Sequence, residues 1–437
     1  DGATVKDASD YVHWGQAASG DIITAPGLWH LDNFGNKLIA TITDGTSFEW
    51  DADATNATST RATAITSAPT ASRLSLVSTP DRHLVFFGTE TTIGTTSTQD
   101  DMYIRWSDQE DINTYTPTAT NTAGTQRIAD GTRIVGAIRG RDAIYVWTDN
   151  AMFVMRFVGA PFTFSFQQVG TGCGLIGKNA AVEVDGSAYW MSENGFFRYT
   201  GKLESLPCLV EDYVFDDLNT VPRQHINAGL NNLFGEVTWF YASSGSASID
   251  RAVTYNYMDS TAERPVWTTS SLDRTAWEDS AVFGKPHATY YDADATSDAT
   301  VGNTDGVTTY YEHETGVNQV KSGTTSAIAA NIESGDFDLD QQKGLGGDGE
   351  YMLKIRRIIP DFLQQTGTAI VTLNLRDFAN QSQSGSTLGP FDSTTSTTKI
   401  DTRARGRAAS LKISNSAQNT HWKLGTFKLD IQPDGRR

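Results

Sequence analysis

The sequence predicts an all-β protein, a β-propeller followed by a C-terminal β-sandwich-like domain. Three observations lead to this class. Short apolar runs alternate with polar residues, helix signals are scarce, and tryptophans recur at intervals typical of propeller blades. Because the chain has 437 residues, of which 38% are hydrophobic and 10% aromatic, it can bury a large core.

Alternating apolar and polar residues predict many short strands. In PFTFSFQQV, the side chains of Phe162, Phe164 and Phe166 are expected on one face of a strand, opposite those of Thr163 and Ser165. A hairpin turn is expected at residues 148–150, where the polar sequence TDN separates two such runs. The same pattern predicts strands in 143–148, 151–157, 236–243, 251–257, 369–375 and 427–432.

One helix is predicted, in the segment LVEDYVFDDLN. Val210, Val214 and Leu218 fall on one face at helical spacing, and Glu211 and Asp212 lie in the first turn, where the helix dipole favours acidic side chains. Elsewhere Gly, Asn, Asp and Thr interrupt the apolar runs, so no other helix is expected.

The tryptophan spacing suggests the propeller. Trp106, Trp147 and Trp190 are 41 and 43 residues apart, and Trp239 and Trp277 follow after 49 and 38 residues. Since a four-stranded blade takes about 40–45 residues, each blade is expected to bury one tryptophan in an equivalent place. The alternative is a plain sandwich, or several small sheets, in which ten tryptophans produce such intervals by chance.

The composition changes near residue 327. Beyond it the predicted strands are longer, the tryptophan interval ends, and the end of the chain is basic, with eight Lys or Arg and three Asp or Glu from Asp401 onward. We therefore place the propeller, with loop insertions, in residues 1–326 and a C-terminal β platform domain in 327–437. The uneven charge suggests a self-association surface or two different partners.

The chain is strongly acidic, with 34 Lys and Arg, 52 Asp and Glu, and a formal net charge of −18. Because affinity for nucleic acids comes largely from counterions that Lys and Arg release, this charge disfavours tight binding of DNA or RNA. It equally disfavours an anionic membrane surface. No apolar run is long enough to span a bilayer, so no membrane segment is expected.

The first residues, DGATVKDASDYVHW, contain no Met and have neither the basic nor the apolar part of a signal peptide. We expect a processed chain, or one that begins inside a longer gene product. Cys173 and Cys208 are the only cysteines, which excludes a disulfide framework. Whether the two pair is open, and reduced thiols are the simpler expectation for a protein made in the cytoplasm.

The segment GTGCGLIGKN has the spacing of phosphate-binding loops. Gly172, Gly174 and Gly177 fit G-x-G-x-x-G, and the residues from Gly172 to Lys178 fit G-x-x-x-x-G-K. Such loops need a helix directly afterwards, whereas a strand-like segment follows here. Asn179 also stands where a Ser or Thr would bind magnesium. We therefore predict a glycine-rich turn between blades.

No metal, cofactor or catalytic residues are predicted, and the chain is not expected to be an enzyme. Asp292 and Asp294 begin like a calcium loop, but the glycine and glutamate that complete it are missing. The seven histidines show no zinc-binding spacing, and His313, between two Glu, is expected at the surface. No G-x-S-x-G segment is present.

The segment GDFDLD contains the one candidate site. On a strand, Asp336, Asp338 and Asp340 would share one face, with Phe337 and Leu339 buried on the other. Neighbouring like charges on a strand repel each other by roughly a few tenths of a kcal/mol. A solvated face tolerates this repulsion, and the functional alternative is a carboxylate-lined surface that repels a polyanion.

Longer phrases of the sequence resemble a known family. They are LWHLDNFGNKLIAT, STPDRHLVFFG, IRWSDQEDINTYTPTATNTAGTQRI, GLIGKNAAVEVDGSAYWMSENGFF, LPCLVEDYVFDDLN, DRTAWED and KLDIQPDGRR. From about Leu28 to Arg437 the chain resembles the tail nozzle or hub proteins of short-tailed bacteriophages, of the tail tubular protein B or packaged-DNA-stabilisation type. Larger members of that family carry extra N-terminal sequence.

The resemblance implies a β-propeller within a ring, usually a hexamer, in the virion tail, with assembly in the host cytoplasm. Such a ring lies below the dodecameric head–tail adaptor, bears tail fibres or spikes, retains packaged double-stranded DNA and conducts it during ejection without sequence-specific binding. The family has no catalytic residues. Asp336, Asp338 and Asp340 are then candidate DNA-facing residues, and the basic end, including 433–437, is a candidate contact with neighbouring subunits or the adaptor.

Two other functions stay open from the residues alone. A propeller in a phage tail can bind a host receptor or glycan through exposed Trp and Tyr side chains, without forming a ring. A polysaccharide hydrolase is the other alternative, and it requires that substitution of single Asp or Glu residues abolishes turnover.

Overall fold

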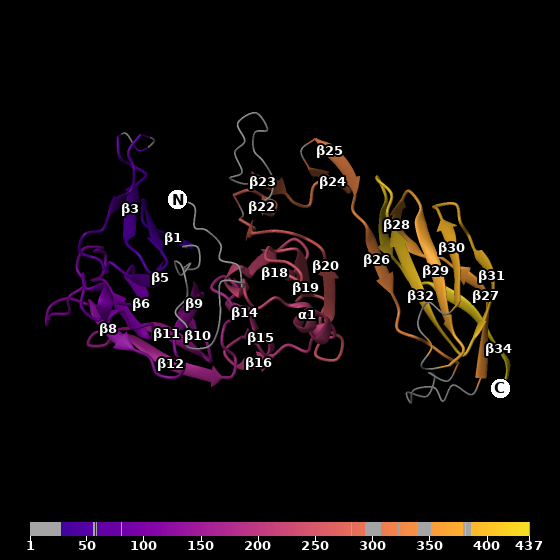
Figure 1. Ribbon diagram of the computed structural model, residues 1–437, viewed down its shortest axis with the longest axis horizontal. Coiled ribbons are helices and arrows are strands. Elements are labelled where there is room, and N and C mark those ends of the chain that lie inside the picture. Colours follow the sequence, from indigo (N-terminus) through magenta and orange to yellow (C-terminus); the bar gives the residue numbers. More distant parts are fainter. Residues whose placement is uncertain are drawn as a thin grey trace, which may run out of the picture. The chain divides into compact units, whose positions relative to one another are not determined.

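The structure is a computed structural model that describes residues 28–436 except 56, 58, 80, 281, 293–306, 322, 340–350, 379–380 and 382–385. It divides into two compact units, residues 1–314 and 315–437, which run from indigo to orange and from orange to yellow in Figure 1. The described parts of both units are built mainly of strands, so the predicted all-β class is confirmed. The division lies before the hairpin 318–327, whereas the predicted boundary lies at its end.

The first unit is a series of antiparallel sheets, each made of strands that are consecutive in the sequence. In its described residues, five sheets have four strands and the sixth has three. We call these sheets blades one to six. In chain order their strands are β1 (Trp29–Phe34), β2 (Lys37–Ile42), β3 (Ser47–Asp51), β4 (Thr63–Ala64); β5 (Ser72–Val77), β6 (Leu84–Thr89), β7 (Tyr103–Trp106), β8 (Gly124–Arg127); β9 (Ile134–Arg139), β10 (Ile144–Thr148), β11 (Ala151–Gly159), β12 (Thr163–Thr171); β13 (Ala181–Val184), β14 (Ser187–Ser192), β15 (Gly195–Tyr199), β16 (Leu203–Ser205); β17 (Asn227–Asn231), β18 (Glu236–Tyr241), β19 (Arg251–Asn256), β20 (Val266–Ser270); and β21 (Ala276–Glu278), β22 (His287–Asp292), β23 (Val307–Glu312).

The blades follow one another through their first strands. β1 lies beside β5, β5 beside β9, β9 beside β13, β13 beside β17 and β17 beside β21. In a propeller, four-stranded meander sheets are likewise arranged radially around a centre. The first unit is therefore built as a β-propeller, and Figure 1 colours its strands from indigo through magenta to orange in chain order.

Three consecutive blades bury a tryptophan in an equivalent position. Trp147 in β10, Trp190 in β14 and Trp239 in β18 lie on the second strand of their blades and are fully buried. Trp106, however, lies in β7, the third strand of its blade, and Trp277 lies in β21, a first strand. The prediction that each blade buries a tryptophan in an equivalent place was thus right for blades three to five. It was wrong for Trp106 and Trp277, which lie on other strands of their blades.

The predicted strand in PFTFSFQQV forms β12, but its alternation begins later than expected. Phe164 and Phe166 pack against Trp106, with ring centroids 5.2 and 6.1 Å apart. Phe162 lies in the preceding turn and is 75% exposed. The prediction that it shares their face was wrong, because Thr163 has a φ of +61°, outside the extended region, and breaks the alternation.

The predicted helix is α1 (Glu211–Asp217), with Val214 buried as expected. Two short 3-10 helices, η2 (Thr96–Thr98) and η3 (Arg223–His225), are the other helical segments of the described chain. None of the described helices is long and apolar enough to cross a membrane.

The second unit is a β-sandwich-like domain, as predicted. Its described sheets have the strand orders β26-β32-β29-β30, β31-β27-β34, β28-β33 and β24-β25. Aliphatic side chains from β27, β29, β31 and β32 meet in one core. The strands are β24 (Asn318–Lys321), β25 (Thr324–Ala327), β26 (Ala330–Glu333), β27 (Tyr351–Ile359), β28 (Phe362–Thr366), β29 (Ala369–Arg376), β30 (Ser386–Ser393), β31 (Ile400–Gly406), β32 (Ala408–Asn415), β33 (His421–Leu424) and β34 (Lys428–Arg436).

Candidate functional site

The predicted acidic segment follows β26 in the second unit. It forms a single β-bridge, from Phe337 to β32, and not the continuous strand that was expected. Phe337 and Leu339 nevertheless pack against the core, as the alternation predicted. Asp336 is exposed and Asp338 is half-buried, whereas Asp340 lies outside the described residues.

Basic side chains of the second unit pair with several of its acids. The Arg376 guanidinium lies 3.1 Å from the Asp336 carboxylate, so one of the three candidate charges is offset by a cation. Arg405 lies 2.6 Å from Asp434. Most of the terminal segment 433–437 belongs to β34, which pairs with β27. Deleting that segment would remove part of a sheet, so substitutions test its role better.

The glycine-rich segment joins β12 of blade three to β13 of blade four, which confirms the predicted turn between blades. A Cβ atom on Gly174 would lie 2.2 Å from the carbonyl oxygen of Asp149, and one on Gly177 would lie 2.3 Å from that of Arg223. These two glycines are therefore required by close backbone packing.

Lys178 extends from this turn to blade one and is buried. Its Nζ donates to the carbonyl oxygen of Leu28 at 3.4 Å and to Oγ1 of Thr43 at 3.1 Å. Burial lowers the pKa of Lys178 to about 8, although Asp44 opposes the change. Burial, with a smaller contribution from the Lys178 charge, also lowers the pKa of His30 to about 3. Only the glycine spacing had drawn attention to Lys178, and its burial had no signal in the sequence.

Asp32 in β1 links three consecutive blades. Its carboxylate accepts the backbone N–H of Val77 in β5 at 2.7 Å and lies 2.5 Å from Nη2 of Arg139 in β9. The Asp32 side chain is 11% exposed, so water screens this contact only partly. One carboxylate thus fixes the relative positions of three first strands.

A polar cavity of about 400 Å³ lies at the turns of blades three and four. Arg133, Asp149, Glu193 and Arg223 line it, so two positive and two negative side chains meet there. Arg223 pairs with Glu193. Burial opposes ionisation of Asp149, but hydrogen bonds from Thr132 outweigh it and lower the pKa of Asp149. Balanced charges of this kind do not single out an anion or a cation as ligand.

A buried network surrounds His83 in blade two. Its Nδ1 lies 2.6 Å from Oδ2 of Asp81, and its Nε2 lies 3.1 Å from Oγ1 of Thr122. The Thr122 hydroxyl donates to Asp108 at 2.6 Å and accepts the N–H of Gln109 at 2.9 Å. The order Asp, His, Thr is that of a nucleophilic relay. Here the hydroxyl is already engaged by three groups and the histidine is buried, so the network stabilises the loops of the blade.

The remaining candidate groups have structural contacts. Cys173 is buried, Cys208 is half-buried, and both are free thiols. Burial raises the pKa of Cys208 to about 11. His313 is not the simple surface residue that was expected, because Nε of Arg274 donates to its Nε2 at 2.9 Å and burial lowers its pKa to about 4. Within the described ranges no cluster of three or more His, Cys, Asp or Glu could hold a metal ion, and Asp294 lies outside them.

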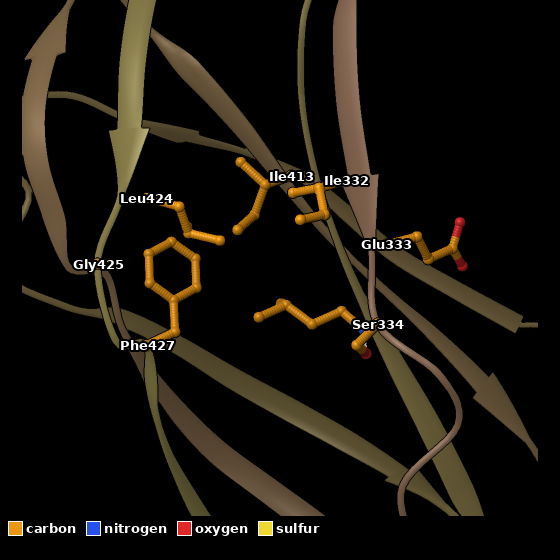
Figure 2. A pocket seen from close by; sticks show the side chains of 8 residues that line it. Ile332, Glu333, Ser334, Ile413, Leu424, Gly425 and Phe427 are labelled. Atoms are coloured by element: carbon orange, nitrogen blue, oxygen red, sulfur yellow. Dashed lines mark hydrogen bonds between the residues drawn. The ribbon is translucent and has the colours of Figure 1, made fainter. Parts of the chain in front are cut away.

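An apolar pocket of about 170 Å³ opens in the second unit, between the edge strand β26 and the β33–β34 connection. In Figure 2 the side chains of Ile413, Leu424 and Phe427 surround this space, whereas that of Glu333 points away from it. We call this space the apolar pocket. Residues that line it include Ile332, Leu411, Ile413, Leu424, Gly425 and Phe427.

Comparison with known proteins finds no matching family model and no matching curated protein. Among solved structures, the AfRom2 CNH domain is 10% identical, with 70% of this chain and 88% of that one covered at a TM-score of 0.39. BamB from Moraxella catarrhalis is 12% identical, with 66% and 82% covered at 0.33. An exo-beta-1,3-galactanase from Phanerochaete chrysosporium is 9% identical, with 92% and 94% covered at 0.28. Because each TM-score is below 0.5, these likenesses carry no argument about function.

Proposed function

We propose that this chain is a structural protein of a short-tailed bacteriophage virion. In this proposal it forms a ring-shaped tail nozzle or hub that retains packaged double-stranded DNA and conducts it during ejection. The proposal is supported by the sequence phrases quoted above, which occur in both units and resemble that family in order. It is also compatible with a first unit built as a propeller, the fold that the resemblance implies.

The observation that carries the proposal is the charge of the first unit. Residues 1–314 contain 19 Lys and Arg and 40 Asp and Glu. A conduit must let a duplex pass without retaining it, and a surface poor in Lys and Arg offers few groups that release counterions from phosphates. A propeller with this charge is suited to a wall along which DNA slides.

The ring is tested first by electron microscopy of the purified protein, alone and mixed with its head–tail adaptor. We expect closed rings, usually of six copies, with a central hole wide enough for a DNA duplex. Monomers under both conditions would contradict the proposal, and binding of the monomer to a host glycan would favour the receptor-binding alternative.

The DNA-facing role of Asp336, Asp338 and Asp340 is tested in assembled particles. Replacing all three by Lys places positive charge where DNA is proposed to pass, so DNA ejection should slow. The reduction is expected to be modest, because Arg376 already offsets the charge of Asp336. Asp392→Lys, an exposed substitution on β30 of the same unit, is the control. Ejection kinetics that stay unchanged in the triple variant would contradict the assignment.

A further inference from the structure

Blade three carries an exposed apolar projection at the turn between β11 and β12. Phe162 is 75% exposed, Val158 is 54% exposed and Phe157 is 40% exposed. We call these three residues the hairpin tip. A solvent-exposed group of apolar side chains at the end of a hairpin is unfavourable in an isolated molecule and is typical of a contact site.

The hairpin tip is held firmly in place. The ring of Phe157 packs on His83 and on Phe164, with centroids 5.8 Å apart in both pairs. The hydroxyl of Thr163 donates to the carbonyl oxygen of Thr122 at 3.1 Å. Since the base of the turn is anchored to blade two, little conformational entropy would be lost if the tip entered a binding pocket.

The apolar pocket of the second unit has the size and lining that suit one aromatic ring. Its volume is about 170 Å³, and Ile, Leu and Phe side chains form most of its wall. An enclosed cavity of about 150 Å³ lined by such side chains binds benzene, so a space of this volume accommodates one aromatic ring. A phenylalanine side chain presents the same ring on a methylene group, so Phe162 matches the pocket in volume and polarity.

The charges beside the hairpin tip and the apolar pocket are opposite. Arg156 is exposed and is the only charged residue of the hairpin 151–171. Beside the pocket, the Asp361 carboxylate accepts the N–H of Thr426 at 2.8 Å and lies against Gly425. Strand alternation directs the nearest lysines of β32 and β33 to the faces opposite the pocket-lining leucines.

From this match we infer that the hairpin tip of one copy inserts into the apolar pocket of the next copy. Phe162 fills the pocket and Arg156 lies near Asp361. The two surfaces belong to different parts of one chain, so the contact is heterologous, and repeating it gives a ring if the rotation closes. The inference rests on the proposed ring function and identifies the contact that builds the ring.

Disulfide trapping tests the contact directly. A chain carrying both Phe162→Cys and Leu424→Cys should form a ladder of covalent oligomers on mild oxidation, seen on a non-reducing gel. Each single variant is the matched control and should give no ladder, because it lacks one of the two introduced thiols. The natural Cys173 and Cys208 are present in every variant, so any cross-link through them would show in the single variants as well. A double variant without a ladder, or with only an internal cross-link, would overturn the inference.

A surface substitution tests the contact without disturbing the fold. Phe162→Asp should raise the concentration needed for assembly by roughly ten- to a hundred-fold, as expected for loss of a central aromatic anchor. The control is Leu233→Asp, which changes another exposed apolar turn residue of the first unit, 67% exposed, and should assemble like the parent chain. Sedimentation velocity measures both.

The two proposals fail in different ways. If the parent chain forms rings and Phe162→Asp forms them equally well, this contact is wrong and the nozzle function stands. If the parent chain forms no rings with or without the adaptor, the proposed function fails first.

Discussion

The two units of this protein bury different kinds of side chain. The first unit has 19 basic and 40 acidic residues, whereas the second has 15 and 12. Among the described residues, every buried Asp, Glu, His, Lys or Arg belongs to the first unit. They are Asp81, His83, Glu90, Arg105, Lys178 and Arg274. In the described core of the second unit, the buried side chains are aliphatic, and partly buried Phe and Leu or Ile side chains pack against them.

The difference follows from how many sheets each unit must hold together. A sandwich buries two sheet faces against each other, and aliphatic packing suffices for that. A propeller joins several small sheets, so polar groups at the joints must find partners. Arg105 donates to the carbonyl oxygens of Tyr115 at 3.2 Å and Thr91 at 2.8 Å. Arg274 lies 3.9 Å above the ring centroid of Tyr311. Buried charges thus fix loops and blades in the first unit.

The largest expected effect comes from Trp239→Ala in the first unit. Trp239 is fully buried, packs on Phe196 with centroids 4.9 Å apart, and donates to the carbonyl oxygen of Ala180 at 3.0 Å. Loss of these contacts should lower the free energy of unfolding by about 3–5 kcal/mol. Hydrogen exchange should show weaker protection in blades four and five and unchanged protection in β29.

The control for that change is Trp29→Ala. Trp29 is 53% exposed, and surface substitutions usually change stability by about 0.5 kcal/mol or less. If Trp239→Ala weakens hydrogen-exchange protection equally in both units, the two units unfold together. Their different cores then do not give them separate stabilities.

A smaller loss is expected for Asp32→Asn. The amide keeps the shape of the side chain but removes its negative charge. That charge pairs with Arg139 and strengthens the hydrogen bond that the N–H of Val77 donates. Hydrogen bonds to charged groups contribute about 1.5–3 kcal/mol to stability. Because Arg139 is partly exposed, we expect a loss near the lower end of this range. Urea unfolding measures this loss of stability, and hydrogen exchange measures the protection of β1, β5 and β9.

Acid should destabilise the first unit through His30 and His313. Their folded pKa values, about 3 and about 4, lie below the unfolded value of 6.5. As pH falls below about 6.5, the unfolded chain takes up protons first, so the free energy of unfolding decreases until the folded pKa values are reached. We expect a loss of roughly 1–2 kcal/mol per histidine at pH 5.

Thermal unfolding at pH 7.5 and pH 5 checks this dependence. His313→Gln should reduce the difference between the two pH values, because Gln does not titrate. An unchanged difference in both His313→Gln and His30→Gln would assign the acid sensitivity to other groups.

The smallest effect is expected for Asp401→Asn in the second unit. Asp401 lies 3.1 Å from Arg357 and 2.9 Å from Lys399, and its side chain is 59% exposed. Water screens exposed ion pairs, so the loss of stability should stay below that of Asp32→Asn and diminish in high salt. A larger loss for Asp401→Asn would reverse the comparison between the units.

The sequence by itself determined the elements whose signal is local. Alternation predicted β10, β11, β18, β19 and β29, helical spacing predicted α1, and the strand-like pattern after GTGCGLIGKN predicted a strand there, which is β13. These features depend on neighbouring residues, which set backbone conformation and the side of a strand on which a residue lies.

Only the tertiary structure decided which distant groups meet. Nothing near Lys178 in the sequence indicates Thr43, and nothing near Asp32 indicates Arg139, because both contacts depend on how successive blades are placed. The position of Phe162 also depended on the backbone at Thr163, which the alternation could not reveal. The apolar pocket joins β26 to β32 and the β33–β34 connection, and its lining residue Leu411 lies 77 residues after Ser334 in the chain. Local patterns specify strands, whereas burial, pairing and cavities arise when those strands pack.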